Sequence, residues 1–323
     1  MGTGCYNRTE GGKLMKTVAY SEVRSWMYRN ARNLELRLWQ YYFEHGTKEA
    51  VVDALMFYQN EDGGFGHALE ADNWNPNSTP ITTDHAIKIL RKIHFEDMSH
   101  PIFQGIWRYL HSEKDLLSYG WRFTVPSNNE YPHAPWWNYS EEQNQKEYFG
   151  VTAELSAFIL KYGSRESPLW EKARNLADTL LLLLSSDEAY GDMGLEGFIT
   201  LVNTAKEICL PGYDYNILSE VLARKIKGAI EHDTEKWAFY TVRPSTFIRS
   251  AHSSFYPENT EIVKKELEYL VKTKPQNGVW GITWTWFENM ERYQAYFNVS
   301  ENWWKSLKAI ENMEFLRNFG YVK

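Results

Sequence analysis

Apolar residues recur every three or four positions along almost the whole of this 323-residue chain, and that spacing limits the possible folds more than any other feature. One stripe runs through Met27, Ala31, Leu34, Leu38 and Tyr42. Such spacing places apolar side chains on one face of a helix, whereas a half-buried strand shows strict alternation, which is scarce here. The pattern predicts an all-α protein of about ten or more helices.

Residues suited to helix ends bound several of these stripes. Thr47, Asn259 and Ser300 favour helix starts because their side-chain oxygens can accept hydrogen bonds from first-turn amides, and Gly320 favours a stop. A further stripe runs from Ile217 to Ala229. The other predicted helices span 47–58, 80–94, 101–111, 150–162, 168–184, 194–208, 259–273 and 300–318.

The charge balance and the cysteine content exclude several classes of partner. The chain has 35 Lys and Arg against 42 Asp and Glu, a formal net charge of -7, so it has no basic surplus for a polyanion and we expect no nucleic-acid partner. Cys5 and Cys209 are too few for a disulfide framework or a Cys-rich metal site. We therefore predict no metal site from the cysteines.

The N-terminal segment carries no targeting signal that we recognise. No segment supplies about 18 consecutive apolar residues, so we expect no transmembrane helix. The first fourteen residues are polar and Gly-rich without an apolar core for a secretory signal, which predicts a cytoplasmic protein. Because Met15 opens a second plausible start, residues 1–15 are interpreted as a leader, disordered or wrongly started; a real but mobile N-terminus is the alternative. Residues 16–323 are then expected to form a single domain.

A turn rich in glycine and aromatic residues occurs near both ends of the chain. Residues 59–66 (QNEDGGFG) follow one predicted helix, and residues 275–281 (PQNGVWG) follow another. Looser versions occur near residues 120–137 and 190–191. Glycine reaches positive φ without steric cost, and the aromatic residue two positions after Gly63 or Gly278 can fold back on a neighbouring helix. The repeating unit is predicted to be a helix, this turn and a second helix.

The motif Gln59-x-x-x-Gly63-x-Phe65 resembles the Gln-Trp repeat of squalene and oxidosqualene cyclases and the Asp-Gly-Gly-Phe turns of protein prenyltransferase β subunits. The longer string 63–72 (GGFGHALEAD) also resembles bacterial prenyltransferase or squalene-oxidase repeat proteins, for which we know of no activity to carry over. The resemblance implies an α/α toroid, in which an inner ring of helices surrounds a central cavity and an outer ring runs antiparallel to it.

The chain lacks the residues that the activities of these families need. It has no Asp-x-Asp-Asp acid for protonating an alkene and no Asp-rich segment for a magnesium-held diphosphate. A prenyltransferase zinc site needs an Asp, a Cys and a His, and Cys209 between Ile208 and Leu210 is interpreted instead as a small buried hydrophobe. The resemblance therefore supports the fold and argues against the named activities, and whether the chain is an enzyme stays open.

Residues 61–85 hold the densest set of chemically capable side chains. Glu70 and Asp72 are the predicted catalytic pair, because one nearby carboxylate can raise the pKa of the other, as general-acid catalysis requires. His67 is a predicted ligand-binding residue. The alternative is that these residues stabilise the loop. A metal site from His67, Asp72 and His85 has no recognised ligand spacing, so none is predicted.

Aromatic residues, which make up 16% of the chain, supply further candidate ligand contacts. His133, Trp136 and Trp137 lie in a loop stiffened by two prolines, and such a platform suits stacking on a sugar, a prenyl chain or a cation. Trp284 and Glu288 form a second candidate group near the C-terminal turn. Core packing is the alternative for the tryptophans.

Three kinds of function remain open, and each involves a small-molecule ligand or a partner. The chain is expected to be a terpenoid-cyclase-like toroid that acts on or binds an isoprenoid or similar apolar molecule, a carbohydrate-active hydrolase or lyase, or a non-catalytic binding toroid. We expect a cavity lined by Trp and Tyr with at least two of Glu70, Asp72, His133 and Glu288. No cofactor and no oligomeric state can be named from the sequence.

Overall fold

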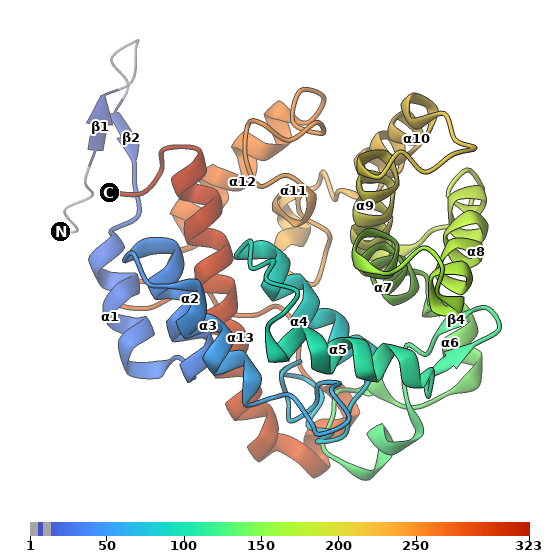
Figure 1. The fold of residues 1–323 in the computed structure, drawn as a ribbon. Helices are drawn as coiled ribbons and strands as arrows, with labels where there is room; N and C mark the ends of the chain where they lie inside the picture. Colours follow the sequence, from blue (N-terminus) through green and yellow to red (C-terminus); the bar gives the residue numbers. More distant parts are fainter. Residues whose placement is uncertain (1–5, 9–13) are drawn as a thin grey trace. The chain divides into compact units, whose positions relative to one another are not determined.

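The computed structural model describes residues 6–8 and 14–323, and Figure 1 shows that this part of the chain is predominantly helical. Helices account for 61% of the structure and strands for 4%, which confirms the all-α prediction. Most of the segment interpreted as a leader, namely residues 1–5 and 9–13, lies outside the described residues. No helix within 14–323 is both long and apolar enough to cross a membrane.

The α-helices follow the predicted ranges closely at most positions. They are α1 (Tyr20–Asn30), α2 (Asn33–Phe43), α3 (Lys48–Met56), α4 (Pro80–Lys92), α5 (Pro101–Ser112), α6 (Glu141–Glu147), α7 (Phe149–Tyr162), α8 (Pro168–Leu183), α9 (Gly191–Glu207), α10 (Tyr215–Ala229), α11 (Pro244–Phe247), α12 (Thr260–Thr273) and α13 (Met290–Asn318). Besides short 3-10 helices, the described residues contain two short antiparallel strand pairs: β1 (Tyr6–Arg8) with β2 (Leu14–Lys16), and β3 (Leu116–Leu117) with β4 (Gly120–Trp121).

Three helices begin in the same way, with proline in the first turn after a capping side chain. The Thr79 hydroxyl caps α4 by accepting a hydrogen bond from an amide of the first turn, His100 caps α5, and Ser167 caps α8. Proline suits this position because its missing N–H would have no helical partner there. These local signals explain why the predicted starts of the three helices agree with the structure.

Two predicted helices have different ends in the structure. The stripe from Met27 to Tyr42 is divided between α1 and α2, because Ala31 and Arg32 adopt extended backbone angles. The start predicted at Ser300 is wrong: α13 begins at Met290, and Ser300 is buried inside it. A kink at Tyr293 (φ -124°, ψ 20°) interrupts α13 near its start.

The chain divides into two compact units, which we call the central and the terminal unit. The central unit comprises Leu55–Ala229 with Trp286–Gln294. The terminal unit comprises the described residues up to Ala54, together with Ile230–Thr285 and Ala295–Lys323. The expectation of one domain over 16–323 stays a prediction.

In the central unit, α7 packs against α4, α8 and α9, and α9 packs against α10 (Figure 1). Every residue of α7 from 149 to 160 is buried, as expected for a helix that is covered on all sides. Its backbone lies very close to that of α9, since a Cβ added to Gly197 would lie 2.5 Å from the carbonyl oxygen of Gly150. These two helices therefore form a closely packed core for the unit.

The terminal unit joins the two ends of the chain. Val18 forms a parallel bridge with Val322, and α13 contacts both N-terminal helices through Asn302, which donates to the Asn30 carbonyl at 2.6 Å, and Arg317, which donates to the Tyr42 carbonyl. On α12, the fully buried Glu266 carboxylate accepts from the Ser245 amide at 2.7 Å at the start of α11. Burial raises the pKa of Glu266, although Arg243 opposes that rise.

The first Gly-rich turn has the backbone that its sequence predicts. Gly63 has φ +91°, and the fully buried Phe65 follows it. The Gln59 side-chain amide donates to the carbonyls of Gly63 and Ile102, at 2.9 Å each, and so ties the turn to α5. Glutamine and glycine thus serve one purpose here, which is to hold a tight turn against a helix.

The second turn differs from the first in one respect. Trp280 does fold back on the preceding helix, where its indole N–H donates to the Leu270 carbonyl at 2.9 Å. The left-handed residue, however, is Asn277 (φ 57°) and not Gly278. Asparagine is among the side chains that tolerate this conformation, so the turn does not need glycine at that position.

Candidate functional site

The predicted catalytic pair lies buried in a loop of the central unit, with Glu70 only 5% and Asp72 only 1% exposed. The Glu70 carboxylate accepts from the Asp72 amide at 2.9 Å, and Asp72 Oδ1 accepts from the Trp286 indole at 2.6 Å. The Ala134 amide donates to the Asp72 carbonyl at 2.9 Å. These bonds join three segments of the unit, which favours the structural alternative; the acid/base role stays a prediction.

His133 lies in the same buried cluster. Its Nδ1 is 2.6 Å from the Tyr131 carbonyl and its Nε2 is 2.7 Å from the Asn138 side-chain oxygen, while its own carbonyl accepts from Asn289 at 2.8 Å. The fold thus brings Asp72 and His133 together through the segment 286–289. Trp286, to which sequence reasoning assigned no role, joins this segment to the loop of Asp72, and Asn289 joins it to the loop of His133.

A network of buried asparagines supports this cluster, and sequence reasoning missed it. The side chains of Asn73 and Asn75 both donate to Asn128 Oδ1, at 3.2 and 2.9 Å, and Asn128 donates to the Trp137 carbonyl at 3.0 Å. Buried amides need such partners because an unpaired one is costly. The signal in the sequence was the run of alternating asparagines at 73, 75 and 77, which a simple loop does not require.

The other predicted polar ligands lie at the surface of the central unit. His67 is exposed with a left-handed backbone (φ 56°), and its Nε2 lies 2.8 Å from the Asn60 side-chain oxygen. Glu288 is exposed. Within residues 14–323, we find no contact that joins His67 or Glu288 to the buried cluster of Asp72 and His133.

The three predicted tryptophans have different environments. Trp137 is buried with its ring 5.0 Å from that of Phe123, whereas its neighbour Trp136 is half-buried with its ring 6.4 Å from Phe287. Two adjacent tryptophans therefore do not share one core. Trp284 belongs to the terminal unit, where its ring lies edge-on to those of Tyr240 and Trp304, at 5.9 and 5.2 Å.

The expected burial of Cys209 is wrong, because this residue is exposed. It follows α9 with a left-handed backbone (φ 51°), and the Leu210 amide donates to the Ala205 carbonyl, as in a helix C-terminal cap. Leu210 takes the buried position instead. In the part of the chain that the structure describes, no three His, Cys, Asp or Glu side chains are grouped to hold a metal ion.

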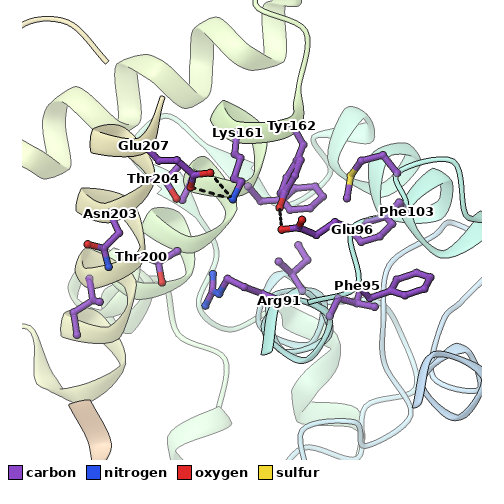
Figure 2. A pocket seen from close by; sticks show the side chains of 16 residues that line it. Arg91, Phe95, Glu96, Phe103, Lys161, Tyr162, Thr200, Asn203, Thr204 and Glu207 are labelled. Atoms are coloured by element: carbon purple, nitrogen blue, oxygen red, sulfur yellow. Dashed lines mark hydrogen bonds and ion pairs between the residues drawn. The ribbon is translucent and has the colours of Figure 1, made fainter. Parts of the chain in front are cut away.

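A pocket of about 310 Å³ lies in the central unit between α4, α5, α7 and α9 (Figure 2). Its apolar lining includes Ile87, Leu90, Phe95, Phe103, Ala157 and Phe158. None of the predicted site residues lines it, so it is not the Trp- and Tyr-lined cavity expected from the sequence. Sequence reasoning missed this pocket because most of its apolar residues, Phe95 excepted, fit the ordinary buried stripe of a helix.

A row of aromatic rings forms one wall of the pocket. The rings of Phe95 and Phe103 lie 6.0 Å apart and 10° from parallel, and those of Phe103 and Phe158 lie 6.2 Å apart and 14° from parallel. Tyr162 continues the row, with its ring 5.3 Å from that of Phe158. The row gives one side of the pocket an apolar lining against which a hydrocarbon chain can pack.

Charged side chains surround the pocket, and each has a partner of its own. Lys161 pairs with Glu207 at 2.9 Å, and the Tyr162 hydroxyl donates to Glu96 at 3.2 Å, as the dashed lines in Figure 2 mark. Arg91 pairs with a carboxylate behind the pocket, Glu154. The edge of the pocket is therefore polar, and its charged side chains already have partners within the protein.

Behind the pocket, Glu154 is the centre of a buried charge cluster. Its carboxylate lies 2.7 Å from Arg91 and 3.7 Å from Lys88, and it accepts from the Thr200 hydroxyl at 2.9 Å. Burial alone would raise the pKa of Glu154, but Lys88, Arg91 and the Thr200 hydrogen bond together hold it below its usual value. The carboxylate is therefore ionised and fixes the position of the pocket-lining Arg91.

The second carboxylate of this cluster, Asp84, has a pKa shifted in the opposite direction. Its Oδ2 lies 2.8 Å from Lys88, one turn further along α4, whereas its buried Oδ1 has no hydrogen-bond partner among the described residues. Burial raises the pKa of Asp84 to about 7; Lys88 opposes this rise and the nearby Glu154 adds to it. Two carboxylates that share one lysine thus have pKa values shifted in opposite directions.

Replacing Asp84 by asparagine is expected to flatten the dependence of stability on pH between about pH 4 and pH 7. The folded protein keeps a proton that the unfolded chain, with a carboxyl pKa of about 3.8, releases, so the wild-type free energy of unfolding falls as the pH rises through this window. Urea denaturation across this range should show the wild type losing about 3 kcal/mol relative to Asp84→Asn. Parallel pH profiles would contradict the assignment.

Comparison with protein-family models, with curated proteins and with solved structures finds no match to this chain. The resemblance of the first Gly-rich turn to the cyclase and prenyltransferase repeats therefore rests on the residues that carry it. The geometry of the central unit is the remaining basis for assigning a function.

Proposed function

We propose that the protein binds a small, predominantly apolar molecule in the pocket of the central unit. The observation that carries the proposal is the row of Phe95, Phe103 and Phe158 along a pocket of about 310 Å³. Small-molecule sites are concave and mostly apolar, with a few polar groups that fix orientation, and their volumes begin at about 300 Å³. The pocket has each of these properties.

The size and shape of the pocket favour a short isoprenoid or a similar chain. Its volume equals that of about ten water molecules in the liquid, which suits a ligand of roughly ten to fifteen non-hydrogen atoms. An isoprenoid is a hydrocarbon chain, which suits a wall of phenylalanine rings. The turn motif at Gln59, Gly63 and Phe65 adds support, and with it we propose that the helix–turn–helix units belong to a terpenoid-cyclase-like α/α toroid.

The electrostatics of the pocket favour binding over catalysis. A general acid or base needs a carboxyl or imidazole group that can reach the substrate in a suitable protonation state. Glu96, Glu207 and Glu154 are each engaged by a tyrosine, a lysine or an arginine. A carbohydrate-active site would also need a pair of carboxylates flanking a groove, and the wall here is phenylalanine.

Filling the pocket with a larger side chain is expected to abolish binding. Geraniol and myrcene, ten-carbon isoprenoids, serve as probes and should bind the wild type with a Kd on the order of 10–100 μM. Ile199 lines the pocket and is not fully buried, so Ile199→Trp can occupy the cavity without rebuilding the core. Isothermal titration calorimetry should show an increase in Kd of at least about tenfold.

The matched control is Ile217→Trp, the same change at a residue of α10 that is 56% exposed and does not line the pocket. It should leave both Kd values unchanged. If neither probe binds the wild type, the proposed function is wrong. If both probes bind Ile199→Trp as tightly as the wild type, the ligand does not occupy this pocket and the assignment fails.

A further inference from the structure

Two threonines one turn apart on α9, Thr200 and Thr204, both line the pocket (Figure 2). The Thr200 hydroxyl is engaged, with Glu154 Oε1 at 2.9 Å and the Glu196 carbonyl at 3.2 Å. The Thr204 side chain forms no hydrogen bond with any described residue, although Thr204 is only 8% exposed. A threonine inside a helix commonly bonds the carbonyl four residues back, so this hydroxyl is unusual in having no partner within the described part of the chain.

A second uncommitted polar group lies beside it. Asn203 also lines the pocket, is exposed at its edge, and forms no side-chain hydrogen bond with residues 14–323. Hydroxyl and carboxamide groups can each donate and accept. The Thr204 hydroxyl and the Asn203 carboxamide, the two groups of α9 that line the pocket without a hydrogen-bond partner among the described residues, are therefore both uncharged.

The charged groups at the pocket offer no surplus of either sign. Arg91 and Lys161 are the cations that line it, Glu96 and Glu207 are the lining carboxylates, and Glu154 lies directly behind Arg91. A charged ligand group entering here would lose its water and find each opposite charge already paired. If the ligand displaced one group from such a pair, the displaced group would itself be left without an opposite charge.

From these contacts we infer that the natural ligand is an uncharged, mainly apolar molecule with a single oxygen group, a hydroxyl or a carbonyl, that hydrogen-bonds the Thr204 hydroxyl. This inference rests on the proposed function and names the chemical class of the ligand. The apolar body lies on the Phe95, Phe103 and Phe158 wall, and the oxygen group is directed toward α9. Organic anions and amines of the same size are excluded by the paired charges.

The test uses ligands with similar ten-carbon isoprenoid bodies and different ends: geraniol, the hydrocarbon myrcene, geranate and geranylamine. Calorimetry with the wild type should show geraniol binding about tenfold more tightly than the hydrocarbon, as one well-placed hydrogen bond allows, and more tightly than either ion. Thr204→Val keeps the shape of the side chain and removes the hydroxyl. This substitution should weaken the binding of geraniol about five- to tenfold. The binding of the hydrocarbon should be unchanged, which also shows that the pocket is intact.

Thr204→Ser, which restores a hydroxyl, should return most of the preference for geraniol over the hydrocarbon. If Thr204→Val leaves that preference unchanged, or if geranate or geranylamine binds the wild type more tightly than geraniol, the inference is overturned while apolar binding in the pocket stands. If no member of the series binds the wild type, the proposed function itself fails.

Discussion

Gly63→Ala is expected to lower the free energy of unfolding of the protein by about 3–5 kcal/mol. Gly63 has φ +91°, and a Cβ at this position would lie 2.0 Å from the carbonyl oxygen of Gly105 in α5. The obstacle is backbone, so no side-chain rotation can relieve it, and the left-handed conformation adds its own cost. Moving α5 away would also break the hydrogen bond that the Gln59 side chain donates to the Ile102 carbonyl.

Urea denaturation followed by circular dichroism measures this effect. Gly228→Ala is the matched control, because Gly228 lies near the end of α10 in the same unit and an added Cβ would meet nothing within 4 Å. Alanine is the better helix former, so this control should be unchanged or more stable by up to about 1 kcal/mol. Equal stability of Gly63→Ala and the wild type would show that the turn can move away from α5 at little cost.

Trp286→Ala is expected to cost about 3–5 kcal/mol of stability, because it empties a fully buried site and removes the hydrogen bond to Asp72. Trp286→Phe keeps most of the ring and removes only the indole donor, so its cost should be smaller, about 1–3 kcal/mol. Trp284→Ala, two residues away and half-buried, should cost less than Trp286→Ala. Comparable losses at the two positions would contradict the role given to Trp286.

The same cluster allows the predicted catalytic pair to be tested against its structural alternative. In a double-mutant cycle, Asp72→Asn and Trp286→Phe should show a coupling energy of about 1 kcal/mol or more if their hydrogen bond holds the loop of Asp72 to the segment 286–289. An acid/base role for Glu70 and Asp72 would instead leave stability near normal in Glu70→Gln and Asp72→Asn and lower the rate on a substrate by about 10²- to 10⁴-fold.

Much of the fold could be predicted from local signals, and its exceptions have local causes. The starts of α4, α5 and α8 follow from a capping residue and a proline at the first turn. The break between α1 and α2 could not be predicted, because the apolar stripe continues across Ala31 and Arg32 while the backbone does not. The spacing of apolar residues predicts which residues face the core, but it does not predict whether they lie on one helix or on two.

The candidate site was less predictable than the fold. Sequence reasoning identified the loop of Glu70 and Asp72 and the loop of His133, and the structure does bring these together through Trp286 and Asn289. It could not identify the pocket, since Phe103 and Phe158 look like ordinary core residues until the rings are seen side by side. Nor could it show that Thr200 is engaged and Thr204 is not, because that difference depends on a buried carboxylate 46 positions earlier.

The close backbone approach of α7 and α9 determines how the pocket can change. Since Gly150 and Gly197 leave no side chain between the two helices, the helices cannot move closer, and separating them would open a void in the core. Ligand preference in relatives of this protein should therefore change by substitution of lining side chains, while the helical frame stays constant. The ion pair of Lys161 and Glu207 at the pocket is less constrained, because it is partly exposed and contributes only about 1 kcal/mol or less.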